Sequence, residues 1–286
     1  MSDQAQSAYR RVIVGLCHGE AEAETMRTAA EFAQLLGLGL HCLLIEDEAL
    51  LSLAELPFAR EIRLPTHTWS PLTTDAIEAD IRQIVIQTRR RMDEIIRDIG
   101  VPTEFEVLRG DPATCIATTC QTSDIVVVAG HGPSTIPATH SIARLRAGAH
   151  EAATSILLLP TRFKHRHGPV VAILTGAADS ALDMACRLAA GAREDLVIVL
   201  PEQVEKQAVE SRARGRADLP SARISIRVIR GIQMEDFLHA LTDLRERLIV
   251  AVREASTAAV VSRVAAERGV PLLLVGAEGS AGQDPP

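Results

Sequence analysis

The feature that most constrains the fold of this sequence is a strand, a helix and a second strand within its first 45 residues. Apolar runs at 12–16 and 40–45 predict two buried strands. The segment between them, about 21–36, carries apolar residues at helical spacing and stops at Gly37. Such a unit builds a parallel sheet. We therefore expect an α/β protein.

The same alternation continues to residue 160. Strands are predicted at 103–108, 125–129 and 156–159, and helices from Pro112 through about 116 and at 141–151. Residues 48–73 contain three prolines and are expected to form a surface excursion, a short helix followed by extended chain. A long helix follows, capped by Thr74 or Asp75 and ended by Gly100. Its apolar stripe repeats in steps of three and four residues: Ile77, Ile81, Ile84, Thr88, Met92, Ile95 and Ile99.

The pattern then restarts, which predicts an internal repeat. Further strands are expected at 170–174, 196–200, 224–229, 248–252 and 272–275. Helices are expected at 180–190 (ended by Gly191), 202–214, 231–244 and 257–268. We therefore predict a first domain at 10–160, a linker at 161–169 and a trimmed second domain at 170–276.

Composition excludes several classes of function. Only 2% of residues are aromatic, so the core must be aliphatic, and few rings can stack on single-stranded nucleic acid. A net charge of −7 gives no broad basic face, so we expect no nucleic-acid partner. No apolar run approaches the roughly 20 residues of a membrane span, and the first ten residues lack an apolar signal core. We expect a cytoplasmic protein without a membrane partner.

Cysteine and histidine give no metal or disulfide pattern. The five cysteines include no Cys-x-x-Cys pair and are expected to be buried small hydrophobes in a reducing compartment. His165 and His167 lie in the basic linker without a nearby carboxylate or cysteine, so we expect solvated linker and no metal site.

The order of elements and three stretches carry a resemblance to a known family. The stretches are Leu43-Leu44-Ile45-Glu46-Asp47-Glu48, then Gly110-Asp111-Pro112, then Asp124-Ile125-Val126-Val127-Val128-Ala129-Gly130-His131-Gly132. Together they resemble the universal stress protein family in its tandem two-domain form. The resemblance is good across residues 10–160 and weak across residues 168–276. The resemblance implies two Rossmann-like domains with five-stranded parallel sheets that form an intrachain pseudo-dimer. In it the last strands, 156–159 and 272–275, pair and cover each other's edges.

Nucleotide-binding members of the family carry the pattern G-x2-G-x9-G-[ST] after the fourth strand. Its glycines let backbone amides approach phosphate, and its last residues open a helix that receives it. This sequence keeps only Gly132; Ala129, Ile142 and Ala143 stand at the other positions. Cys17 stands where the family has its adenine-side Asp. The second half has Thr175 at that place and no glycine in 253–257, so we expect the family's usual ATP binding to be absent.

The carboxyl ends of the strands remain the expected ligand site, because ligands bind there in open α/β sheets. The ordinary alternative is a strand-to-helix turn that needs small residues. An adenine nucleotide is the cofactor that the resemblance implies. Ser141 can supply the hydroxyl donor that Ala143 lacks at the family's Ser/Thr position. No catalytic residue is assigned. The expected binding residues are Cys17, Ile45, Gly130, His131, Gly132, Ser134 and Ser141.

The function expected from these features is that of a non-catalytic stress-response or regulatory protein that binds a small ligand or a protein partner. One rival is an ATP- or AMP-binding switch that uses the loop at 129–143. Another is an enzyme of the same broad fold, centred on the Cys17 thiol or on the loop 175–180. That loop, Thr-Gly-Ala-Ala-Asp-Ser, resembles the S-G-G-x-D-S pyrophosphate loop, although Asp179 or Ser180 can equally cap a helix there. Two assemblies also stay open, a monomer and a homodimer of tandem chains.

Overall fold

The computed structural model describes residues 9–17, 23–63, 68–131, 140–152, 155–160, 167–215, 224–253 and 255–276. Its main sheet consists of β1 (Arg11–Cys17), β2 (Gly39–Asp47), β5 (Thr103–Gly110), β6 (Asp124–His131), β7 (Ser155–Pro160), β8 (Val170–Ile173), β9 (Leu196–Pro201), β10 (Ile224–Ile229), β11 (Leu248–Val252) and β12 (Leu272–Val275). A small hairpin consists of β3 (Arg60–Arg63) and β4 (Thr68–Pro71). The helices are α1 (Ala23–Leu36), α2 (Glu48–Ala54), α3 (Thr74–Ile99), α4 (Pro112–Thr119), α5 (His140–Ala152), α6 (Ser180–Ala192), α7 (Lys206–Arg214), α8 (Met234–Ala240) and α9 (Ala255–Arg268).

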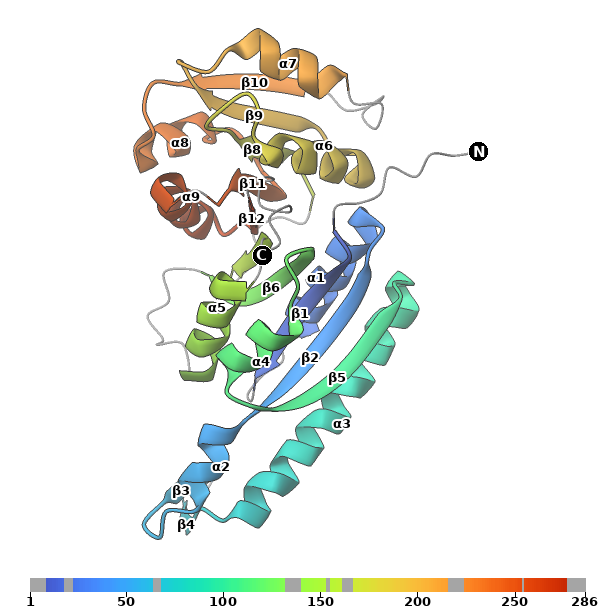
Figure 1. Cartoon of the computed structure of the whole chain (residues 1–286), viewed down its shortest axis with the longest axis vertical. Helices are drawn as coiled ribbons and strands as arrows, with labels where there is room; N and C mark the ends of the chain where they lie inside the picture. Colours follow the sequence, from blue (N-terminus) through green and yellow to red (C-terminus); the bar gives the residue numbers. More distant parts are fainter. Residues whose placement is uncertain are drawn as a thin grey trace, which may run out of the picture.

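One ten-stranded sheet runs through both halves of the chain in the order β10-β9-β8-β11-β12-β7-β6-β1-β2-β5 (Figure 1). Numbered within its own half, each set of five strands follows the same order, 3-2-1-4-5. All pairs within a half are parallel, whereas β7 and β12 pair antiparallel, with Leu157 opposite Leu273. The predicted pairing of the two last strands is confirmed, and so is the doubly wound α/β class. The predicted linker lies mostly outside the described residues, so the domain boundaries stay a prediction.

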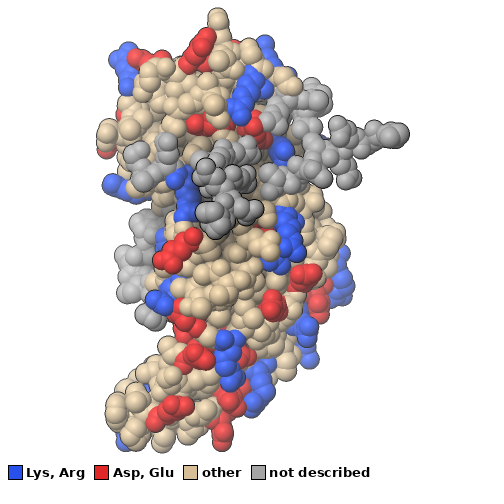
Figure 2. Space-filling model, in the orientation of Figure 1, with Lys and Arg blue, Asp and Glu red and all other residues tan. Residues whose placement is uncertain are grey.

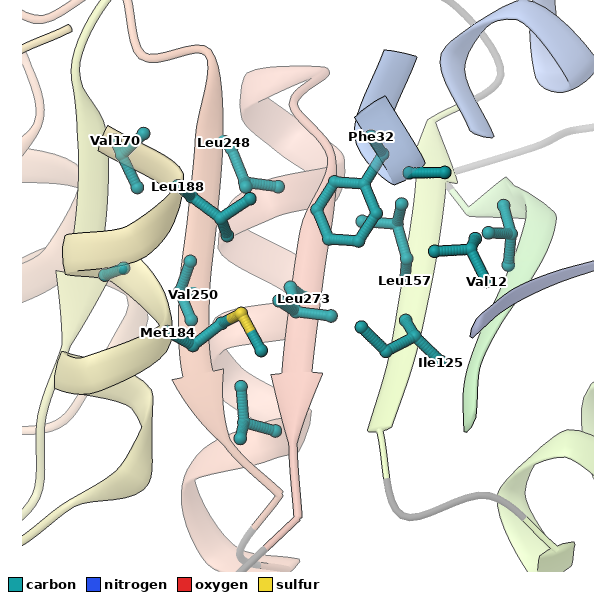
Figure 3. Close-up of a cluster of buried hydrophobic side chains, with 14 of the residues drawn as sticks. Val12, Phe32, Ile125, Leu157, Val170, Met184, Leu188, Leu248, Val250 and Leu273 are labelled. Carbon is teal, nitrogen blue, oxygen red and sulfur yellow. The ribbon is translucent and has the colours of Figure 1, made fainter. Parts of the chain in front are cut away.

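Two apolar layers sandwich the sheet because alternate residues of each buried strand face opposite sides. Val12 and Val14 of β1 join the layer under α1, α3, α6 and α7, whereas Ile13 and Cys17 join the layer under α4, α5, α8 and α9. The first layer is continuous across the junction of the halves. Figure 3 shows Phe32 of α1 beside Leu157 and Leu273 there. Both cores are almost wholly aliphatic, as the composition predicted.

Three local predictions about helix ends were wrong. Gly191 does not end α6; the helix continues to Ala192, and Arg193 caps it in a left-handed conformation (φ 56°). A Cβ on Gly191 would lie 2.6 Å from the backbone oxygen of Leu35, so this glycine lets α6 approach the end of α1. The cap of α3 is Thr73 rather than Thr74 or Asp75, and α8 ends at Ala240, before the predicted 244.

A projecting arm distinguishes the first half from the second. It consists of α2 and the β3–β4 hairpin, joined to the first half through α3, and it occupies the segment predicted as a surface excursion (Figure 1). In the described part of the second half, the corresponding place between β9 and α7 holds only a short turn. None of the helices in the described ranges is both long enough and apolar enough to cross a membrane.

Candidate functional site

The candidate site lies where β1, β2 and β6 end and α5 begins. Cys17 is the last residue of β1, and Ile45 of β2 lies opposite it in register; both side chains are buried. Gly130 and His131 belong to β6, where His131 pairs with Pro160 beyond an irregularity in the ladder. The strand predicted to end at residue 129 therefore continues for two more residues. Gly132 and Ser134, also predicted, lie outside the described residues.

A buried hydrogen-bonded cluster joins three of these elements. Asp47, the last residue of β2, accepts a hydrogen bond through Oδ2 from the hydroxyl of Ser141 in the first turn of α5. Its other oxygen, Oδ1, accepts from the backbone N–H of Ala49 at 2.9 Å and so caps α2. The thiol of Cys17 donates to the backbone oxygen of Ser141 at 3.8 Å. Asp47 and Ser141 are only 3% and 7% exposed, so these contacts are shielded from water. We call Asp47, Ser141 and Cys17 the Asp47 cluster.

Close packing of α5 places Ser141 against the strand ends. A Cβ on Gly148 would lie 2.5 Å from the backbone oxygen of Ala113 in α4, so only glycine lets these helices approach so closely. A Cβ on Gly15 of β1 would meet the side chain of Leu145 at 2.8 Å. One glycine on α5 and one on β1 therefore bring the first turn of α5 to the Asp47 carboxylate.

The electrostatics of the cluster keep its thiol protonated. Burial is the main cause that raises the pKa of Cys17 to about 12, and the negative charge of Asp47 and the neighbouring Cys115 contribute to the same rise. A thiol in that state is a hydrogen-bond donor and a poor nucleophile. Its donation to Ser141 agrees with this protonation state.

A charged rim surrounds the cluster. Arg144 of α5 donates to Asp111, the cap of α4, from Nε to Oδ1 and from Nη2 to Oδ2, both at 2.7 Å. This guanidinium holds the pKa of Asp111 well below its usual range, and hydrogen bonds from Thr114 act in the same direction. Beside it, Arg109 and Glu46 form an ion pair of 3.1 Å across β5 and β2. These rim charges are paired within the chain.

The corresponding loop of the second half is closed by its own hydrogen bonds. Asp179 Oδ2 accepts from the backbone N–H groups of Thr175 at 2.6 Å and Gly176 at 3.0 Å, and from the Thr175 hydroxyl at 3.1 Å. Asp179 stands at the cap position of α6, but its side chain does not cap the helix; Ser180 instead donates to Gly276 at 3.0 Å. The expectation that one of these two side chains caps α6 is therefore not met. The amides that a pyrophosphate would need already have an acceptor.

No group of three His, Cys, Asp or Glu side chains that could hold a metal gathers within the described parts of the chain. His165 lies outside those parts. His167 is exposed, with Nδ1 3.7 Å from Glu194 Oε1.

Asp47 is the site residue that sequence reasoning did not assign. It appeared only within the acidic end of the second strand, as part of a fold resemblance. A carboxylate directly after a buried strand and before a helix-forming run is typical of a helix cap, and this signal could have identified Asp47. Its second contact, with Ser141, joins residues 94 positions apart, and no local pattern shows it.

Comparison with known proteins agrees with this description. No protein-family model matches the sequence, and a search of curated proteins found no match. Solved structures do match, first a universal stress protein from Archaeoglobus fulgidus DSM 4304, with a TM-score of 0.63 and 14% identity over 96% of this chain and 100% of that one. A candidate universal stress protein from Pseudomonas aeruginosa UCBPP-PA14 has a TM-score of 0.50 and 15% identity over 94% of each chain. The cytoplasmic domain of a prokaryotic cation chloride cotransporter has a TM-score of 0.52 and 9% identity over 95% of this chain and 97% of that one.

The class that the sheet order and these matches define is a doubly wound α/β protein built from two similar halves. More narrowly, the fold is that of the universal stress proteins, matched over nearly the whole chain. The resemblance inferred from the sequence is thus confirmed for the fold.

Proposed function

We propose that this chain is a cytoplasmic stress-response or regulatory protein that works by binding a small ligand or a protein partner and does not catalyse a reaction. The fold is shared with universal stress proteins and with the cytoplasmic domain of a transporter. Fold alone does not specify activity, so the proposal depends on the site.

The observation that carries the proposal is the hydrogen bond from Ser141 to Asp47. In the resemblance, the first turn of this helix receives a phosphate, because a helix N-terminus attracts anions. Here a carboxylate of the chain itself already accepts from that turn. A phosphate brought within about 4 Å of it would meet a repulsion of about 4 kcal/mol per unit charge at the effective dielectric of a protein surface. The Asp47 cluster therefore favours a site that does not accept ATP in the family's usual way.

Two further contacts favour binding over catalysis. The Cys17 thiol, the centre of one enzyme hypothesis, has its pKa raised to about 12 by burial. The loop of the other hypothesis is closed on Asp179. A nucleophile needs the thiolate and a pyrophosphate loop needs free amides, so both features count against chemistry at these places.

A thermal-shift titration of the whole chain with ATP, ADP and AMP, with and without magnesium, tests the proposal. Nucleotide at 100 times its dissociation constant would stabilise the folded protein by about 2.7 kcal/mol. For a chain of this size, that corresponds to a rise in melting temperature of about 4 to 5 °C. We expect no rise, and a reproducible rise of that size would contradict the proposal.

Matched variants identify the cause of the expected absence. Ala129→Gly, Ile142→Gly and Ala143→Ser together restore the family's glycine pattern while leaving Asp47 in place. Adding Asp47→Asn removes the carboxylate charge at the helix. We expect nucleotide to stabilise the variant with all four substitutions more than the variant that keeps Asp47. Equal responses would show that Asp47 does not exclude phosphate.

A further inference from the structure

The arm carries a concentrated exposed apolar surface. Phe58 is 76% exposed and Trp69, the only tryptophan of the chain, is 64% exposed. Leu53, Leu56 and Ile62 are exposed by two fifths to a half. We call these five side chains the arm surface. Five of the nine large apolar side chains exposed in the described ranges therefore lie in this short segment.

The hairpin presents its apolar side as one face. Ile62 of β3 lies directly opposite Trp69 of β4, so their side chains share a face. The neighbouring pair, Glu61 and Ser70, points to the other face and is joined by a hydrogen bond of 3.1 Å. A two-stranded hairpin is marginal in water without a covered apolar face. The exposed face of this hairpin is therefore suited to a protein partner.

The size of the arm surface matches one half of a dimer interface. Aromatic side chains present about 150–250 Å², so Phe58 and Trp69 together expose about 300 Å². With the three aliphatic residues the exposed area is about 500 Å², near the upper limit for patches on monomers. A stable dimer buries about 800 Å² per partner, and in homodimers about 65% of that is apolar, which is again about 500 Å².

The charge of the arm also suits a second copy. The chain carries a net charge of −7, so two copies repel each other, whereas residues 48–73 carry three acidic and two basic residues and contribute only −1 to that charge. Figure 2 shows the end of the molecule that carries the arm with few charged side chains at its tip. The arm lies at the opposite end from the second half, so a contact there leaves the rest of the molecule free (Figure 1). An anionic membrane, by comparison, recruits clusters of Lys and Arg, which the arm lacks.

We propose that the arm surface is a homodimer interface, in which the exposed apolar face of one copy packs against the same face of a second copy. The contact is isologous, because each copy presents the same residues. Phe58 and Trp69 are its expected energetic centre, since aromatic residues dominate such interfaces.

Trp69 itself reports the contact, because its emission shifts to shorter wavelength when water is removed from the indole. With the whole chain, we expect the Trp69 emission to shift reversibly to shorter wavelength as the protein concentration rises from about 1 to 100 µM. Sedimentation velocity should show a dimer over the same range. Phe58→Ser keeps Trp69 as the probe and removes a highly exposed side chain, so the fold is expected to remain, as checked by circular dichroism. It should raise the dissociation constant at least about tenfold.

Val228→Ser is the matched control, because Val228 is an exposed apolar residue of the second half. We expect it to leave the dimer unchanged. A monomer with an unshifted spectrum throughout the range would overturn the proposal. A dimer that Phe58→Ser leaves intact, or that Val228→Ser abolishes, would overturn it too. A blue shift that appears only with added anionic vesicles would assign the arm to a membrane instead.

Discussion

Removing the Asp47 carboxylate should destabilise the first half by an amount that the contacts specify. Asp47→Ala leaves the buried Ser141 hydroxyl without its acceptor, which costs about 1–3 kcal/mol. The same change removes the cap of α2, which costs about 1 kcal/mol. The expected loss in free energy of unfolding is therefore about 2–4 kcal/mol.

A double-mutant cycle isolates the contact itself. Hydrogen bonds to charged groups contribute about 1.5–3 kcal/mol, so Asp47→Ala and Ser141→Ala should together cost less than the sum of the two by about that amount. Urea unfolding is followed by circular dichroism, because the one tryptophan, Trp69, is 64% exposed on the arm and its emission reports the arm and not the core. Agreement of near- and far-ultraviolet transitions tests whether unfolding is two-state.

Thr73→Ala supplies the control for that cycle. Thr73 caps α3 by accepting from the N–H of Ala76 at 3.3 Å, a hydrogen bond that does not involve Ser141. Its loss should cost about 0.5–1 kcal/mol and add to the effect of Ser141→Ala. A coupling between Asp47 and Ser141 below about 0.5 kcal/mol would refute the reasoning, because the pair would then be no better connected than the control.

Three further predictions follow from other contacts. Arg268 donates to Glu246 from Nε at 2.6 Å and from Nη2 at 2.7 Å, and the Glu246 side chain is fully buried. Arg268→Ala should therefore lower the free energy of unfolding, measured in urea, by about 3–5 kcal/mol, and a loss below about 1 kcal/mol would contradict this. At pH 8, Cys17 should be alkylated on the order of 1000-fold more slowly in the folded chain than in urea, because folding raises its pKa from 9.0 to about 12. Peptide mass spectrometry measures both rates. Comparable rates would show that the thiolate is accessible and contradict the prediction. Arg144 lowers the pKa of Asp111, so this pair stabilises the fold above the usual aspartate pKa and loses that effect as pH falls. The difference in free energy of unfolding between wild type and Arg144→Ala should therefore shrink below about pH 4. A constant difference from about pH 7 to pH 2 would contradict this prediction.

Local sequence signals predicted most of the elements because the strands are continuous apolar runs and the helices have clear stripes and ends. The stripe from Ile77 to Ile99 gave α3 to within a residue, and Gly100 closes it in the left-handed conformation (φ 75°) that glycine tolerates. The order of these elements and the right-handed crossover rule leave few arrangements for a parallel sheet. The pairing of β7 with β12 came from the family resemblance and not from the local pattern.

Contacts between distant segments account for what the sequence did not predict. Gly191 looked like a helix end, but it serves the approach of α6 to Leu35, a contact that only the packed halves create. Asp179 looked like a cap, but its carboxylate turns back to the loop before it. The hydrogen bond between Asp47 and Ser141 depends on how closely α5 packs on β1 and α4. Small residues allow this close packing, but their presence in the sequence does not predict it.

The most direct test of the proposed site is isothermal titration calorimetry of the whole chain with magnesium-ATP, because it measures binding without reference to stability. Asp47, in place of a phosphate, accepts from the first turn of α5. We therefore predict no saturable heat up to about 1 mM nucleotide, which corresponds to a binding free energy weaker than about −4 kcal/mol. A saturable isotherm with a dissociation constant in the micromolar range would contradict the proposal that Asp47 closes this site to ATP.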